Sequence, residues 1–542
     1  MKSGRSYDYV VIGAGTAGCV LANRLTENGK FTVLLLEAGP SDNYPWIHLP
    51  IGYAKTMFNP KYNWMFETEP EPHMNDRRIY WPRGKVLGGS SSINGLIYIR
   101  GQAEDYDLWA QQGNDGWSWQ EVLPYFKKLE SNERGESRYH GGSGPIACSD
   151  IHERHELMDA IIRGGNEMGV PTNNDFNGAT QEGVGYYQLF TRAGWRCSAA
   201  KGYLRPARRR ANLAVETGAV ATQIVFDGTR AAGVKFRQGG KMFEVRAARE
   251  VLLCAGAVQS PQLLELSGVG SAAVLKRHGI PMVANLPGVG ENLQDHLQFR
   301  LIYQCKKPIT TNDALGSIWG KIGIGLQWLK NRSGPIGVGI NHGGMFACAL
   351  PDSKTPDIQF HFAALSAEMA AGKPHEWSGF TFSVCQLRPT SRGSVHIKSN
   401  DPSAPPSIQP NYMATEEDRV AALAAVRYAR TLANTNAMQP YTLAEYRPGP
   451  AATSDEELLA FCRNYGATIF HPSSTCTMGT GEMAVVDARL RVRGLSNLRV
   501  VDCSIMPTLV SGNTNAPVAM IAEKAADMIL QDAQPTPGSH GR

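Results

Sequence analysis

Short runs of hydrophobic residues alternate with a helical pattern at the start of the chain. Residues 7–12 and 31–36 are mostly apolar, and residues 17–25 between them have apolar positions at helical spacing. A strand, a helix and a strand in this order predict parallel strands that are buried on both faces. Later runs predict further strands and a closing helix, at 213–227, 243–254, 497–502 and 516–532. This pattern is typical of an α/β fold built on a parallel sheet.

The middle of the chain has a different pattern. Three segments are typical of antiparallel strands, at 356–364, 380–388 and 393–398. In the first of them Ile358 and Phe360 alternate with Gln359 and His361, which predicts one buried face and one polar face. Residues 416–436 predict an alanine-rich amphipathic helix. We therefore expect an antiparallel sheet covered by helices here, and an α+β fold overall.

Turn-forming residues predict two further features. Residues 41–82 are rich in Pro, Tyr, Trp and Asn, which predicts a long covering loop. Ser260, Pro261 and Gly268 suit the N-cap, the first position and the C-terminal turn of a helix. We therefore expect this helix to begin at Ser260.

Composition narrows the class of protein. With 542 residues, 42% hydrophobic and 19% charged, the chain is globular and large enough for two or three domains. A net charge of +5 is small for this length and argues against nucleic acid as a partner. The ten cysteines include no Cys-x-x-Cys pair and no zinc-ligand spacing. We expect a reducing compartment, no disulfide framework and no metal site.

The N-terminus and the hydropathy bear on localisation. A strand is predicted from Tyr7, which leaves no room for a signal peptide. No apolar run is long enough to span a bilayer. We expect a cytoplasmic protein, with peripheral contact on the inner face of a membrane left open. The sequence makes no prediction of oligomeric state.

The turn after the first strand carries the residues of a nucleotide-binding site. Residues 11–18, called here the nucleotide cradle, have the sequence Val-Ile-Gly-Ala-Gly-Thr-Ala-Gly. Gly13 permits the tight turn, Gly15 lets the backbone approach a pyrophosphate, and Gly18 lets the helix pack closely on the sheet. Glu37 ends the second strand, where a carboxylate can bind both hydroxyls of an adenosine ribose. The pattern predicts dinucleotide binding without separating FAD from NAD.

Polar residues near the other end of the chain are suited to proton transfer. His471 is followed by Pro-Ser-Ser, and Asn513 lies in the sequence Gly-Asn-Thr-Asn. Histidine is the side chain that exchanges protons most readily near neutral pH. No Gly-x-Ser-x-Gly elbow accompanies the serines, which argues against a hydrolase. We interpret His342 and His361 as ordinary histidines, exposed or satisfied in the core, and we assign no role to His296.

Four ordered blocks resemble the glucose-methanol-choline (GMC) oxidoreductase family. They are the nucleotide cradle, residues 84–95 (Gly-Lys-Val-Leu-Gly-Gly-Ser-Ser-Ser-Ile-Asn-Gly), residues 256–270, and the segments around His471 and Asn513. Residues 62–72 and 288–296 resemble the branch of choline dehydrogenases and bacterial alcohol dehydrogenases in particular. The resemblance implies FAD as the cofactor.

The resemblance also implies which residues serve the cofactor and the reaction. His471 would be the general base, and Asn513 would hydrogen-bond the substrate oxygen. Ile93 stands where some members attach FAD through a histidine, so we expect non-covalent FAD. Contacts with FAD are implied for Gly13, Gly15, Thr16, Ala17, Gly18, Glu37, Ala38, Val86, Gly88, Ser90, Asn94, Ile97, Ala221, Asp502 and Thr514.

The implied architecture has two domains, each made of separate stretches of chain. A Rossmann-like FAD-binding domain with a parallel sheet takes residues 1–40, 78–110, 200–300 and 460–535. A substrate-binding domain with the antiparallel sheet takes 111–199 and 301–459, with 41–77 as a covering loop and 536–542 as a flexible tail.

The resemblance gives the least information about the identity of the substrate. Choline-oxidising relatives place a carboxylate just before a Gly-Gly-Phe-like segment, whereas residues 341–346 here contain no acid. That argues against choline and for an uncharged primary alcohol, oxidised to an aldehyde. The electrons would pass to a quinone-like acceptor or to O2. Alternatives left open are a choline dehydrogenase, an oxidase, and an FAD-containing lyase without net redox chemistry.

Overall fold

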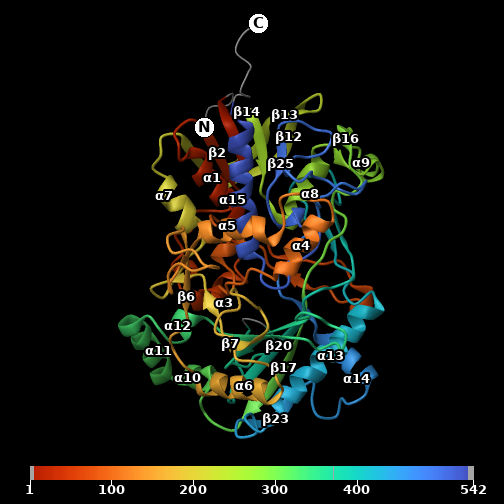
Figure 1. The fold of residues 1–542 in the computed structure, drawn as a ribbon. Helices are drawn as coiled ribbons and strands as arrows, with labels where there is room; N and C mark the ends of the chain where they lie inside the picture. The colour runs from red at the N-terminus through yellow and green to blue at the C-terminus, as the bar shows by residue number, and fades with distance from the viewer. Residues whose placement is uncertain (1–4, 370–371, 535–542) are drawn as a thin grey trace.

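The computed structural model describes residues 5–369 and 372–534 (Figure 1). The predicted flexible tail, 536–542, lies outside these residues. Two seven-stranded sheets organise the molecule, one at each end in Figure 1, and both predicted sheets are thereby confirmed.

The first sheet carries the predicted strand–helix–strand unit. Its path is β11-β2-β1-β14-β13-β12, and β25 pairs with β14. β1 pairs in parallel with both β2 and β14, so Ile12 lies beside Leu36 and Leu253. Its strands are β1 (Ser6–Ile12), β2 (Val33–Glu37), β11 (Leu213–Thr217), β12 (Ala219–Asp227), β13 (Arg230–Gln238), β14 (Lys241–Leu253) and β25 (Leu498–Val500).

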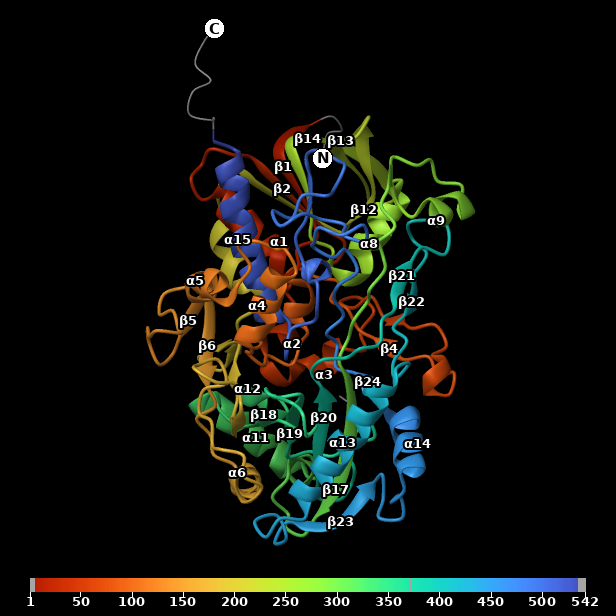
Figure 2. The same cartoon turned by 45° about the vertical axis from the view of Figure 1, so that its right-hand side comes forward.

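Two helices from opposite ends of the chain lie side by side on this sheet. They are α1 (Thr16–Thr26) and α15 (Asn515–Asp532), which Figures 1 and 2 show in contact. The Thr16 hydroxyl donates to the Asn515 side-chain oxygen at 2.7 Å. The Arg24 guanidinium binds the buried Glu523 carboxylate, also at 2.7 Å. The nucleotide cradle is therefore joined directly to the last helix.

The second sheet is antiparallel throughout, as predicted. Its path is β23-β17-β20-β19-β18-β7, and β24 pairs with β17. Its strands are β7 (Gly183–Tyr186), β17 (Leu297–Cys305), β18 (Asn341–Ala347), β19 (Ile358–Ala363), β20 (Gly379–Gln386), β23 (Thr442–Arg447) and β24 (Ala467–Thr468). The third predicted strand, β21 (Ser394–His396), pairs instead with β22 (Ser407–Gln409) in a separate two-stranded sheet.

The two faces of β19 are both buried. Phe360 packs toward Tyr428 of helix α13 (Glu416–Ala433), which covers one face of the sheet. Gln359 and His361 point the other way and are also buried. The alternation was predicted correctly. The polar face does not meet solvent, because it faces a cavity inside the molecule.

The other α-helices lie around the two sheets. They are α4 (Ala103–Gln111), α5 (Trp119–Leu129), α6 (Glu156–Glu167), α7 (Arg205–Ala207), α8 (Gly256–Leu266), α9 (Ala272–Arg277), α10 (Thr311–Gly316), α11 (Ile318–Asn331), α12 (Pro335–Val338) and α14 (Asp455–Tyr465). The predicted covering loop contains the short helices α2 (Pro45–His48) and α3 (Tyr53–Thr56) and the paired strands β3 (Phe66–Glu67) and β4 (Tyr80–Trp81).

The predicted start of α8 is wrong. The helix begins at Gly256, so Ser260 and Pro261 lie inside it. Pro261 has no N–H for the carbonyl of Ala257, and this carbonyl instead accepts a 2.7 Å hydrogen bond from the Thr475 hydroxyl. A distant side chain thus replaces the missing helical bond.

Candidate active site

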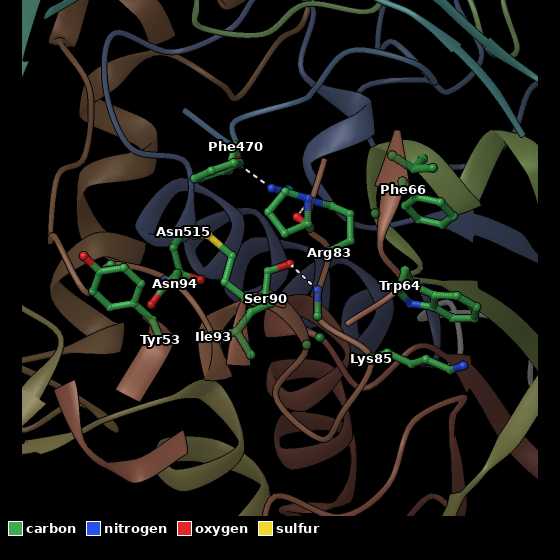
Figure 3. Close-up of a pocket in the computed structure, with 18 of the residues that line it drawn as sticks. Tyr53, Trp64, Phe66, Arg83, Lys85, Ser90, Ile93, Asn94, Phe470 and Asn515 are labelled. Carbon is green, nitrogen blue, oxygen red and sulfur yellow. Dashed lines mark hydrogen bonds between the residues drawn. The ribbon is translucent and has the colours of Figure 1, made fainter. Parts of the chain in front are cut away.

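One cavity of about 970 Å³ connects the nucleotide cradle with the antiparallel sheet. It is lined by cradle residues at one end and by residues of β17 and β19 at the other. Figure 3 shows the part where the covering loop (Tyr53, Trp64, Phe66) faces Ile93 and Asn515. A cavity of this size is at the upper end for small-molecule sites, as a large cofactor and a substrate require.

The cradle glycines have the geometry predicted for them. Gly13 has a φ of +95°, and a Cβ there would lie 2.6 Å from the Cys254 carbonyl oxygen. A Cβ on Gly18 would lie 1.9 Å from the Gly13 carbonyl oxygen. Gly15 lines the cavity, and a Cβ there would have no neighbour closer than 4.0 Å, so its backbone is open to a ligand.

Glu37 ends β2 at the wall of the cavity. Its two carboxylate oxygens accept hydrogen bonds from the amides of Ala14 (2.9 Å) and Gly39 (2.8 Å). Burial raises the pKa of this carboxyl group to about 7, against the effect of the two amides. Ala38 and Ala221 line the cavity beside it. The position and chemistry fit the ribose end of a dinucleotide.

Residues 84–95 pack directly on the cradle. The Gly88 amide donates to the Ala14 carbonyl at 2.7 Å, and a Cβ on Gly89 would lie 2.7 Å from the Gly15 Cα. From this region the cavity is lined by Ser90, Ile93, Asn94 and Ile97. Gly18, Val86 and Gly88 lie behind the lining, and Val86 packs with Ile47 and Tyr62.

The start of α15 points its free backbone amides toward the cavity. Thr514 and Asn515 line it, together with Thr16 and Ala17 of the cradle. An eighteen-residue helix presents unpaired N–H groups and a positive dipole end there, which suits anionic cofactor atoms. Asp502 also lines the cavity, and it accepts hydrogen bonds from the Gly256 amide (2.8 Å) and the Ser260 hydroxyl (2.6 Å).

Hydrogen bonds fix the tautomer of His471. Its Nδ1 lies 3.0 Å from Nδ1 of His296, whose Nε2 lies 3.0 Å from the Leu387 carbonyl oxygen. A carbonyl only accepts, so His296 carries its hydrogen on Nε2 and accepts at Nδ1. His471 must therefore carry its hydrogen on Nδ1. Its Nε2 then carries no hydrogen and can accept one.

The surroundings keep both imidazoles neutral. Burial, helped by the nearby His296, His361 and Arg83, holds the pKa of His471 well below its usual value. Burial also lowers the pKa of His296 to about 4. Nε2 of His471 is consequently an unprotonated base at neutral pH.

His471 and the segment that precedes it are anchored. The His471 amide donates to the buried Asp295 carboxylate at 2.8 Å, and the Thr468 hydroxyl donates to the same carboxylate at 2.5 Å. Arg83 donates to the Phe470 carbonyl at 2.7 Å, as the dashed line in Figure 3 shows. The imidazole is thus held in one position relative to the cavity.

The two predicted catalytic residues lie together. Nδ2 of Asn513 is 3.2 Å from Nε2 of His471, and the Asn513 side-chain oxygen accepts from Gln359 at 3.1 Å. The amide of Gln359 thereby orients Asn513 with its NH2 group toward His471. Both His471 and Asn513 line the cavity.

His361 is a site residue that the sequence patterns did not identify. It lines the cavity, and neither of its ring nitrogens has a hydrogen-bond partner among the residues described. Burial lowers its pKa to about 3, so it is neutral. The sequence did indicate that His361 lies with Gln359 on the polar face of a strand, and this was the observation that could have identified it as a site residue. His342 is buried outside the cavity lining, as expected for a core residue.

A nucleotide cradle that opens beside an unprotonated imidazole defines an oxidoreductase with a dinucleotide cofactor. Within the described part of the chain, no cluster of His, Cys, Asp and Glu could hold a metal ion. The sequence patterns of GMC oxidoreductases match residues 7–298 and 389–522. The chain belongs to this family, and it is an FAD-dependent enzyme that oxidises alcohols.

The similarity to relatives and to solved structures extends over nearly the whole chain. An alcohol dehydrogenase [acceptor] of Pseudomonas putida is 44% identical, with 97% of this chain and 96% of the relative covered. An oxygen-dependent choline dehydrogenase of Serratia proteamaculans is 47% identical, with the same coverage. The crystal structure of pyridoxine 4-oxidase from Mesorbium loti has a TM-score of 0.87 at 31% identity, covering 96% of this chain and 98% of that one.

Proposed function

We propose that the protein oxidises a primary alcohol to an aldehyde, with Nε2 of His471 as the base that takes the hydroxyl proton. The observation that carries this proposal is the hydrogen-bond chain from Leu387 through His296, which leaves that nitrogen without a hydrogen. When bound, FAD supplies the hydride acceptor at flavin N5. The amide of Asn513 and a ring N–H of His361 are placed to hold the substrate oxygen.

An anaerobic screen of alcohols tests this function. A substrate should bleach the yellow colour of the oxidised flavin and yield the aldehyde. Conversion without bleaching would instead support a lyase. Readmission of air then separates an oxidase, which regains colour at once, from a dehydrogenase, which regains it on addition of a quinone.

The substrate alcohol should carry no positive charge. Among the described residues that line the cavity, the carboxylates are Glu37 and Asp502, and both belong to the nucleotide-binding end. Aromatic side chains such as Tyr53 line the substrate half, but none of the described carboxylates is there to balance the charge of an aliphatic cation. We therefore favour other primary alcohols over choline, although several relatives are named choline dehydrogenases.

FAD should be held without a covalent bond and depend on Glu37. Precipitation with acid should release the flavin into the supernatant, because Ile93 offers no atom for attachment.

Glu37→Gln should raise the Kd for FAD about tenfold or more, since an NH2 group would face one of the two amide donors. Titration of apoprotein by flavin fluorescence measures the change. Glu27→Gln, on the exposed end of α1, is the control and should leave the Kd unaltered.

Helix α11 is suited to contact a membrane surface. Ile318, Trp319, Ile322, Leu326 and Leu329 form one exposed face, with 46% to 78% of each side chain accessible. The opposite face buries Ile324 and Trp328. No described helix is long and apolar enough to cross a membrane. An exposed apolar stripe of this kind lies in the interface plane instead.

Charge favours a lipid surface as the partner of α11. Lys321 and Lys330 flank the apolar face, and the helix contains no acidic residue, which complements anionic headgroups. Helix α10, which precedes α11 in the chain (Figure 1), contributes Thr311 and Leu315 to the cavity lining, so this region borders the cavity. We infer that the protein docks on a membrane through α11 and that the flavin is reoxidised there by a quinone-like acceptor.

Sedimentation with lipid vesicles tests this contact. The protein should bind vesicles that contain phosphatidylglycerol and bind pure phosphatidylcholine less well. Trp319→Glu with Leu326→Glu should abolish binding, whereas Met242→Glu, at an exposed position on β14, should not. If the double variant instead dissociates a dimer in lipid-free solution, the face contacts a second copy and the membrane proposal fails.

A further inference from the structure

Arg300 is a partly buried cation in the substrate half of the cavity, and no acid among the described residues forms an ion pair with it. It lies on β17 and lines the cavity, and its Nε is buried with no hydrogen-bond partner among the described residues. Glu368 is the carboxylate that acts on it from nearby, and this group is already bound by His375 (2.9 Å) and by Arg447. No described acid therefore pairs directly with the Arg300 guanidinium.

The charge of Arg300 persists despite its burial. Desolvation lowers its pKa to about 10, and Arg447 acts in the same direction, while Tyr53 and Glu368 oppose them. The side chain remains cationic at neutral pH. A cation whose Nε is buried without a partner is unfavourable for folding, and a ligand in the cavity that pairs with it would offset this cost.

The register of the sheet places Arg300 at a defined distance from the chemistry. Arg300 pairs with Ser383, and Ser383 pairs with His361, so the three residues form one row across β17, β20 and β19. All three line the cavity. Strands two apart are separated by about 10 Å, and the arginine side chain spans part of that distance. One end of a substrate at His361 and His471 can therefore reach the guanidinium with its other end.

Among the described residues of the antiparallel sheet that line the cavity, the polar ones other than Arg300 are uncharged. Gln298 shares the face of β17 with Arg300, and Asn341 and Thr311 line the same half of the cavity. A guanidinium among neutral hydrogen-bonding groups is suited to bind a carboxylate with two parallel hydrogen bonds. A positively charged substrate would meet repulsion in the same place.

We propose that Arg300 binds a carboxylate on the substrate, so that the preferred substrates are hydroxy acids with a primary alcohol at the far end. The class includes 4-(hydroxymethyl)benzoate and ω-hydroxyalkanoates. The carboxylate is unchanged in the reaction, and only the carbinol loses its proton and hydride. This inference rests on the proposed alcohol oxidation and narrows its substrate.

Matched substrates and variants of the FAD-loaded enzyme test the proposal. The value of kcat/KM for 4-(hydroxymethyl)benzoate should exceed that for its methyl ester at least tenfold. Arg300→Gln should lower the value for the acid by about 10- to 100-fold and that for the ester less than threefold. Arg300→Lys should restore part of the loss. Lys373→Gln, which removes an exposed cation at the cavity, should leave the preference intact.

Binding without turnover provides an independent readout. Benzoate should perturb the absorbance of the oxidised flavin, and Arg300→Gln should weaken its binding by a similar factor. Equal kcat/KM for acid and ester, equal losses for both in Arg300→Gln, or the same loss in Lys373→Gln would each overturn the proposal. Failure of the proposed function has a different signature, because then no alcohol bleaches the flavin even if benzoate binds.

Discussion

His471→Ala should slow reduction of the flavin by an alcohol about a thousandfold while leaving FAD bound. The hydrogen-bond chain leaves Nε2 of this imidazole unprotonated beside Asn513, where it can take the substrate proton. Alanine removes it without touching the cradle or the α15 amides, so the cofactor site stays intact. Anaerobic stopped-flow spectroscopy of the flavin measures the rate.

Two controls make this result interpretable. His278→Ala, at the end of α9 and outside the cavity lining, should reduce flavin at the normal rate. The absorbance spectrum of His471→Ala should show the normal flavin content. A rate within tenfold of the native enzyme, with flavin content preserved, would show that another group takes the proton.

The same base sets the pH dependence. Because the pKa of His471 is held well below its usual value, the imidazole loses its activity as a base only when acid protonates it. We expect kcat/KM to be level above about pH 6.5 and to fall only on the acid side of it. An acid limb centred above pH 7 would contradict the burial of this group.

His296→Leu should lower the rate of flavin reduction on the order of a hundredfold although His296 does not line the cavity. Leucine cannot accept the Nδ1 hydrogen of His471, so the imidazole is free to change tautomer and to rotate. His296 is in this sense a positioning residue. Its removal should also move the acid limb of kcat/KM, which a purely structural defect would not do.

The matched variant is His296→Gln. Its side-chain oxygen can accept from His471 while its NH2 group donates to Leu387, in place of the two imidazole contacts. The rate should recover about tenfold relative to leucine. If leucine and glutamine are equally slow and share the native pH profile, the tautomer argument is wrong and His296 serves packing alone.

The cradle was predictable because its requirements are local. Gly13 has a φ of +95°, which favours glycine, and a Cβ on Gly18 would lie 1.9 Å from the carbonyl oxygen of Gly13, five residues earlier. The residue types alone therefore indicated the backbone geometry. The nearness of His471 to Asn513 followed only from the family resemblance, because 42 residues separate them in the chain.

The parts that escaped prediction depend on contacts between distant segments. The partner of His471 lies 175 residues away at His296, and nothing in the spacing indicates that their rings meet. The alternation of β19 correctly separated His361 from Phe360, but a strand does not reveal whether its polar face meets solvent or a cavity. The prediction for the start of α8 was wrong for the same reason. The hydroxyl that replaces the missing helical hydrogen bond belongs to Thr475, which lies 218 residues from Ala257 in the chain.

The pairing of α1 with α15 has a consequence for biosynthesis. The Thr16–Asn515 and Arg24–Glu523 contacts each join residues 499 positions apart, so the wall around the cradle closes only when the final helix has left the ribosome. Flavin capture then follows the synthesis of α15. Nascent chains arrested before that helix would be colourless.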